Sequence, residues 1–102
     1  MNKKEKIKLI EEVVSHFKKC DELFSDINKT FGCCAESPIW DTYWTMFDSY
    51  TESVSKRIDD PYHFLQWFIW ENDCGKKGYE IINEEGDKHN ICSIEDFVEY
   101  AL

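Results

Sequence analysis

Cysteine and histidine are the residue types in this chain best suited to hold a metal ion. His89 and Cys92 lie three positions apart, and Cys74 with either Cys33 or Cys34 would complete four soft ligands. Zinc binds such ligands in a tetrahedral arrangement. Structural zinc sites usually contain two short-spaced pairs such as CxxC, and the chain has no such pair. We therefore predict no metal site and interpret these cysteines as ordinary buried or half-buried thiols.

Cys74 is the cysteine with the most suggestive neighbours for a nucleophile. It precedes Lys76 and Lys77, and nearby lysines lower the pKa of a thiol. A cysteine nucleophile also needs a base, and no spacing places one of the three histidines beside a thiol. The favoured interpretation is a cysteine in the last turn of a helix, where lysines complement the helix dipole. The candidate bases are His16, His63 and His89.

Glu71 and Asp73 directly follow the aromatic run, and paired carboxylates can carry acid–base chemistry or hold magnesium. Two helical positions that lie two apart point in different directions, so a shared site is disfavoured. The chain also lacks the GxxxxGK[ST], GxGxxG, HExxH and GxSxG strings of common nucleotide and hydrolase sites. We predict no catalytic residue and no cofactor.

The charge of the chain disfavours direct binding to nucleic acid. The net charge is −9, and residues 21–102 carry six basic against eighteen acidic side chains. Phosphate backbones are held by lysine and arginine, and only the lysines of the first twenty residues offer such a cluster. That cluster is more typical of a solvated helix end.

The length of 102 residues indicates one domain, 1–102. Only two prolines and four glycines interrupt the chain, which favours helices over a β-sandwich. Lysine and glutamate fill positions 3 to 6, so we expect neither a secretory leader nor a membrane span. An odd count of five cysteines then indicates free thiols and a cytoplasmic location.

Hydrophobic spacing predicts two long amphipathic helices. The first runs from Lys3 to about Cys20, and its pattern continues, as the same helix or a second one, to Gly32. The second starts at Ser37 and reaches about Ile58. At about 100° per residue, four carboxylates align opposite its apolar face, and we call them the acidic row. The acidic row is Asp41, Asp48, Glu52 and Asp59, and Asp60 extends it.

The aromatic run after the second helix is the most distinctive core-forming segment. We predict a third helix from Pro61 to Cys74, with Asp60 as its cap and Gly75 as its end. Such a helix is apolar around most of its circumference, so we expect the rest of the fold to enclose it. The large side chains of this run are Phe64, Leu65, Trp67, Phe68, Ile69 and Trp70.

The period of the sequence changes after Gly78. Residues 79–83 and 89–92 predict a small β-hairpin that must lean on the helices, because two strands alone are marginal. Ser93 with Asp96 resembles a capping box that starts a last short helix. The predicted fold is mainly α: a compact bundle of four or five helices with a small C-terminal β-hairpin.

Three segments between residues 33 and 78 and one near the end of the chain form a recognisable order: Glu36–Asp41, Phe47–Thr51, the string WFIWENDCG at Trp67–Gly75, and Ser93–Phe97. With these segments the chain resembles a group of small, uncharacterised proteins of tailed bacteriophages and prophages. The group has no established activity. The resemblance therefore implies a phage origin and transfers no catalytic residue.

A phage origin leads to the main functional hypothesis. The chain would be an accessory protein that binds and inhibits a host protein, such as a nucleic-acid-binding or defence complex, through its acidic row and Asp60. One alternative is a self-associating structural module, in which exposed aromatic residues form a homodimer interface. Another is a small enzyme or ligand-binding protein that uses Glu71, Asp73 and Cys74.

Overall fold

The computed structural model describes residues 1–31, 38–60 and 62–102, without the side chains of 27, 28, 30, 31 and 38–40. The fold is mainly α, as predicted, with four α-helices and one two-stranded antiparallel sheet in these residues. The elements are α1 (Lys3–Phe31), α2 (Pro38–Arg57), α3 (Phe64–Trp70), a 3-10 turn η1 (Asp73–Gly75), β1 (Tyr79–Ile82), β2 (Lys88–Ile91) and α4 (Ile94–Tyr100).

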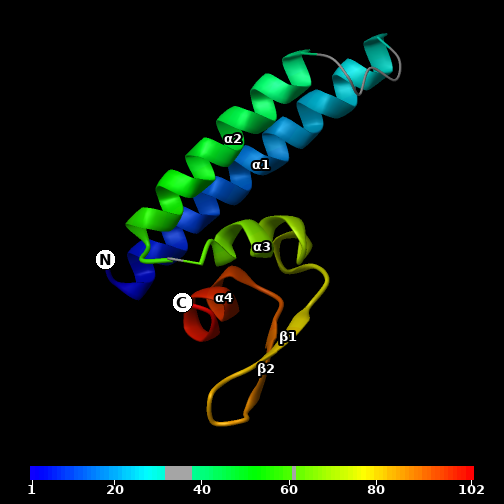
Figure 1. Ribbon diagram of the computed structural model, residues 1–102. Helices are drawn as coiled ribbons and strands as arrows, with labels where there is room; N and C mark the ends of the chain where they lie inside the picture. Colours follow the sequence, from blue (N-terminus) through cyan, green and yellow to red (C-terminus); the bar gives the residue numbers. More distant parts are fainter. Residues whose placement is uncertain (32–37, 61) are drawn as a thin grey trace.

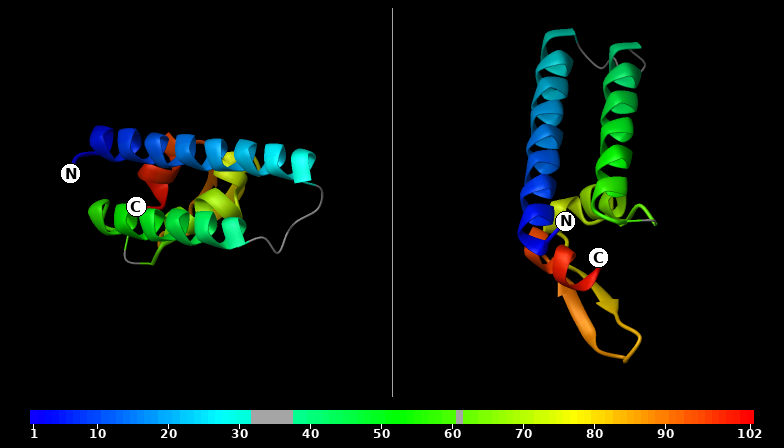
Figure 2. Two further views of the ribbon diagram at one scale, coloured as in Figure 1. Left: turned by 90° about the horizontal axis from the view of Figure 1, so that it is seen from above. Right: turned by 90° about the vertical axis from the view of Figure 1, so that its left-hand side faces the viewer.

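α1 and α2 lie side by side and antiparallel, and they form the longest feature of the molecule (Figures 1 and 2). α1 is one continuous helix of 29 residues, so the hydrophobic pattern beyond Cys20 belongs to the same helix. The amide group of Asn2 caps its start, because Asn2 Oδ1 accepts a hydrogen bond from Glu5 N at 2.8 Å. The helix ends predicted at Gly32 and Ser37 lie outside the described residues.

The core lies where α3, α4 and β2 pack beneath one end of the helix pair (Figure 1). The rings of Phe68 and Phe97 stack at its centre, with centroids 4.7 Å apart. Lys3 of α1 and Glu99 of α4 form an ion pair at the rim. The buried side chains from these elements are Leu9, Ile10, Val13, Val14, Phe47, Val54, Ile58, Leu65, Phe68, Ile69, Ile91, Phe97 and Val98.

The other end of the α1–α2 pair, which includes Leu23, Phe24, Tyr43, Trp44 and Met46, extends beyond α3 (Figure 2). We call it the arm. The molecule measures 51 × 25 × 20 Å, and its radius of gyration is 15.3 Å. A compact domain of this length would have a radius of about 13 Å. The arm carries its own aromatic contacts: Trp44 stacks on Phe24 with centroids 4.8 Å apart and meets Trp70 of α3 at the same distance.

The aromatic helix α3 is shorter and less enclosed than predicted. It begins at Phe64 and ends at Trp70, because both flanking segments contain left-handed residues that an α-helix excludes: Asp59 and His63 before it, and Asp73 and Cys74 after it. The expectation of full enclosure is also wrong at both ends of the helix. Phe64 and Trp70 are each 41% exposed, whereas Leu65, Phe68 and Ile69 are buried.

The C-terminal part matches the predicted hairpin and short helix. Tyr79 pairs with Ile91 and Ile82 with Lys88 across the antiparallel strands. Ser93 caps α4, and its Oγ accepts a hydrogen bond from Asp96 N at 3.1 Å. The Asp96 carboxylate accepts a hydrogen bond from Cys92 N. In a capping box it would accept one from the N–H of Ser93, the next residue.

We expect Gly75→Ala to destabilise the fold more than Gly86→Ala, although both glycines have positive φ angles, 97° and 85°. A Cβ at Gly75 would lie 2.9 Å from the backbone carbonyl of Cys92, whereas nothing lies within 4 Å of one at Gly86. The strain of a positive φ lowers the unfolding free energy by about 1 kcal/mol in either variant. The backbone clash should lower it by at least about 1 kcal/mol more in Gly75→Ala. Urea unfolding measures the difference, and equal losses would contradict this packing.

Candidate functional site

The acidic row occupies an exposed flank of α2. Asp41, Asp48 and Glu52 are exposed along the helix, and Asp59 is exposed just after it. The sides of α2 that face the core instead bury apolar side chains such as Phe47 and Val54. Glu52 has a cation near it, because its Oε1 lies 4.0 Å from Lys56 Nζ one helical turn away. Both side chains are more than half exposed, so this pair contributes little to stability.

Asp60 does not extend the acidic row, and this part of the sequence prediction is wrong. The residue is only 2% exposed. Its Oδ1 accepts a hydrogen bond from Phe64 N at 2.9 Å, and its Oδ2 accepts one from Leu65 N at 2.8 Å. The Asp60 carboxylate thus caps the first N–H groups of α3, but the N-cap position itself is His63 and not Asp60 as predicted, because the helix starts at Phe64. Pro61, the predicted first helical residue, lies outside the described residues.

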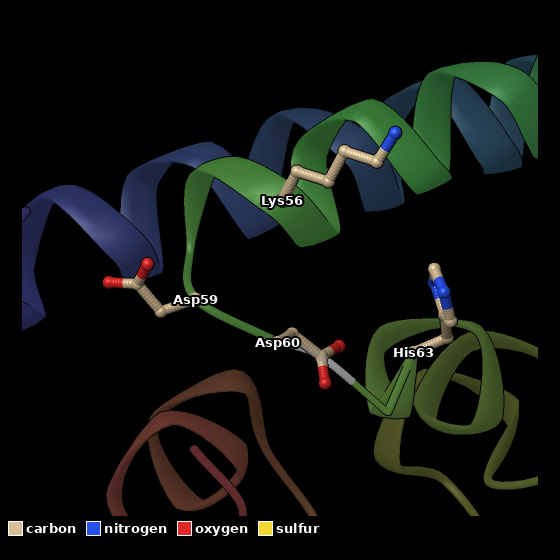
Figure 3. Close-up of a pocket in the computed structure, with 4 residues that line it drawn as sticks. All are labelled: Lys56, Asp59, Asp60 and His63. Atoms are coloured by element: carbon tan, nitrogen blue, oxygen red, sulfur yellow. The ribbon is translucent and has the colours of Figure 1, made fainter.

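The corner between α2 and α3 contains an open pocket of about 500 Å³ (Figure 3). It is lined by Lys56, Asp59, Asp60 and His63. Figure 3 shows that these side chains do not converge: Lys56 runs along α2, Asp59 points away from His63, and only Asp60 turns toward α3. Because Asp60 already accepts two backbone hydrogen bonds, the pocket offers no paired acid and base.

The backbone of this corner is strained at two residues. Asp59 and His63 have φ angles of 57° and 55°, in the left-handed region. This conformation costs about 1–2 kcal/mol for a residue with a side chain, although aspartate and histidine tolerate it better than most. The two hydrogen bonds to Asp60 help to offset that strain. The chain therefore reverses direction here through a turn that helical periodicity alone does not indicate.

The segment with Glu71, Asp73 and Cys74 turns the chain from α3 into β1. Cys74 is half-buried, and burial raises the pKa of its thiol, with the charge of Asp73 acting in the same direction. Lys18 and Lys76 lower that pKa, but by less. The net direction is upward, which opposes the nucleophile that the neighbouring lysines suggested.

Asn72 connects this segment to the β-hairpin. It is fully buried, and its Nδ2 donates a hydrogen bond to Ile91 O at 2.9 Å. Its Oδ1 accepts one from Tyr79 N at 3.4 Å. The side chain therefore joins the end of α3 to both strands, and the segment has a structural role.

The residues considered for zinc have other partners. His89 stacks on Tyr100 with ring centroids 4.0 Å apart. Cys92 Sγ donates a hydrogen bond to Asp96 Oδ2 at 3.3 Å, which raises the pKa of the thiol and lowers that of the carboxyl. In the part of the chain that the structure describes, no three His, Cys, Asp or Glu side chains gather as a metal site would require. Cys33 and Cys34 lie outside that part.

Sequence reasoning missed an apolar groove between α3, β1 and α4, which has a volume of about 530 Å³. The segments that line it lie up to 39 positions apart in the sequence, so no local spacing indicates that they meet. Their residue types are those of a core, and only the tertiary arrangement leaves them open to solvent. The lining residues are Tyr62, Phe64, Trp67, Ile81, Ile82, Tyr100 and Ala101.

Comparison with protein-family models, with curated proteins and with solved structures finds no match to this chain. Among residues 1–31, 38–60 and 62–102, no helix combines the length and the apolar character needed to cross a membrane.

We expect Asp60→Asn to lower the unfolding free energy by about 1–3 kcal/mol, because the amide replaces an acceptor oxygen and leaves a buried N–H of α3 without a partner. Asp59→Asn is the matched control: it removes the same charge from an exposed neighbour, and asparagine tolerates the left-handed backbone, so the change should stay within about 0.5 kcal/mol. Urea unfolding followed by tryptophan fluorescence compares the two. Similar losses in both variants would show that charge, and not capping, dominates.

Proposed function

We propose that this chain is a phage accessory protein that binds a basic surface of a host protein and inhibits it in the host cytoplasm. Support comes from the acidic row: Asp41, Asp48 and Glu52 span about 16 Å along an exposed helix flank, at 1.5 Å per residue. The net charge of −9 has the same sign. The phage origin rests on the sequence resemblance alone.

The class of target follows from the charge. A row of exposed carboxylates is attracted to lysine-rich and arginine-rich grooves, and such attraction speeds encounter, most strongly at low salt. Grooves of that kind bind nucleic acid in nucleases and in defence complexes. An acidic helix that covers the groove would compete with the phosphate backbone, and inhibition would follow without any chemical step.

We expect the double variant Asp48→Lys, Glu52→Lys to lose capture of its partner from bacterial lysate, because it places cations where the partner also carries cations. The measurement is affinity purification with quantitative mass spectrometry. The double variant Glu11→Lys, Glu12→Lys is the control, since it makes the same change in net charge at two exposed positions of α1 that belong to neither proposed surface. Capture that survives in the first variant would refute the proposed surface.

Self-association is the second candidate function, and the arm favours it. Leu23, Tyr43 and Met46 are 37%, 39% and 66% exposed on the arm, and Tyr43 and Met46 line a shallow apolar pocket of about 220 Å³. Two helices with an open apolar face can complete a four-helix bundle by pairing with a second copy.

If the arm pairs with a second copy, light scattering should show a dimer that persists in high salt, and Met46→Glu should convert it to a monomer. The reason is that a carboxylate inside an apolar interface would have to lose its hydration. Thr45→Glu adds the same charge at an exposed position on the acidic flank of α2, between Asp41 and Asp48, and should leave the dimer intact. A wild-type chain that is monomeric at about 100 µM would exclude this candidate, because interfaces of standard size bind more tightly than that.

A further inference from the structure

The apolar groove carries an unusual density of exposed aromatic and branched side chains. Tyr62 is 76% exposed, Ile82 63%, and Tyr100 43%. Tyrosine, tryptophan and phenylalanine are the residue types that most often anchor protein interfaces. Clustered aromatic side chains of this kind mark surfaces that another molecule covers more often than scattered apolar residues do. The groove therefore has the composition of a docking surface.

Strand β1 forms one wall of the groove and has a free edge. The sheet has two strands, and no strand among the described residues pairs with the other side of β1 (Figure 1). The hydrogen bond from Asn83 N to Asp87 O continues the register of the pairs Tyr79–Ile91 and Ile81–His89. Hydrogen-bonded pairs alternate along an antiparallel ladder. The N–H and C=O groups of Glu80 and Ile82 therefore face outward, where an added strand would meet them.

The charge around this edge selects the occupant. Residues 76–102, which supply β1, β2, α4 and the turn before them, contain seven acidic side chains and three lysines. Lys88 pairs with Glu80 and Lys3 with Glu99, so the region keeps an acidic excess after these pairs are counted. A second copy of the chain would bring the same negative charge to the edge and be repelled. A segment with lysine or arginine between apolar residues would instead satisfy both the groove and the carboxylates. The acidic side chains are Glu80, Glu84, Glu85, Asp87, Glu95, Asp96 and Glu99.

We propose that the free edge of β1 and the apolar groove together bind an extended segment of a basic protein, in which apolar and cationic residues alternate. The segment adds to the sheet beside Glu80 and Ile82, its apolar side chains enter the groove, and its cations face the surrounding carboxylates. This inference rests on the proposed function in one respect, the basic character of the partner, but none of the acidic-row residues lines the groove.

The test uses a fluorescent peptide that alternates lysine and valine, with binding to the full chain measured by fluorescence polarisation at about 0.1 M salt. We expect saturable binding that Glu80→Pro weakens at least tenfold, because proline removes the outward N–H. Glu80→Ala removes the same carboxylate but keeps the N–H, and should weaken binding less than threefold. Equal losses in the two variants would overturn strand addition.

Two further measurements cover the other outcomes. A peptide that alternates lysine and serine keeps the charge without the apolar side chains, and it should bind at least tenfold more weakly; equal binding would overturn the role of the groove. Hydrogen exchange on the wild-type chain needs no variant that must fold: the peptide should protect the amides of Glu80 and Ile82, and unchanged exchange there would overturn the proposal.

The acidic-row variant separates this inference from the proposed function. The change Asp48→Lys, Glu52→Lys should alter peptide affinity less than twofold, because those residues lie on α2 and do not line the groove. Peptide binding with no host capture would leave the groove supported and the proposed inhibitor refuted, and the reverse result would refute the groove alone. A dimer that Glu80→Pro dissociates would show that a second copy occupies the edge and would overturn the proposal.

Discussion

The hydrogen bonds of the buried Asn72 side chain are the interaction on which the lower half of the molecule depends. A hairpin of two four-residue strands has too little surface to be stable alone. Asn72 contacts the start of β1 and the end of β2 at once, so it attaches the hairpin to the helix that carries the core ring of Phe68. The wall of the apolar groove is positioned by this contact, and a polar side chain can be fully buried there because its hydrogen bonds are made.

The aromatic residues have two structural roles. Phe68 and its neighbours fill the core, whereas Trp70 reaches the arm and meets Phe17 and Trp44 edge to face. Edge-to-face contacts of this kind add about 0.5–1.5 kcal/mol beyond the area they bury. These contacts connect α3 to both long helices and fix the position of the arm relative to α3. Even with these contacts, Trp70 as a residue remains 41% exposed.

Helical periodicity predicted α1 and α2 well, because long amphipathic patterns leave little ambiguity, and turn chemistry predicted the hairpin and the Ser93 cap. Helical periodicity failed at the ends of α3, where aspartate, histidine and cysteine adopt left-handed conformations that favour glycine. The exposed carboxylates of α2 could be read from spacing. The burial of Asp60 could not be predicted from spacing, because a tertiary turn decides whether a carboxylate after a helix faces water or the next helix. The groove was beyond sequence reasoning, since residues as distant as Tyr62 and Tyr100 meet only in the folded chain.

The uninterrupted length of α1 has a geometric consequence. α1 extends without a break from the core to the far end of the arm (Figure 2). It therefore supports both the carboxylates of α2 and the groove below α3. A partner that engaged one of these surfaces would hold the other at a fixed separation. The second contact would then form at a high effective concentration, and affinity would come from two individually weak attachments. The molecule would then bind tightly only to partners whose two attachment points have a matching separation.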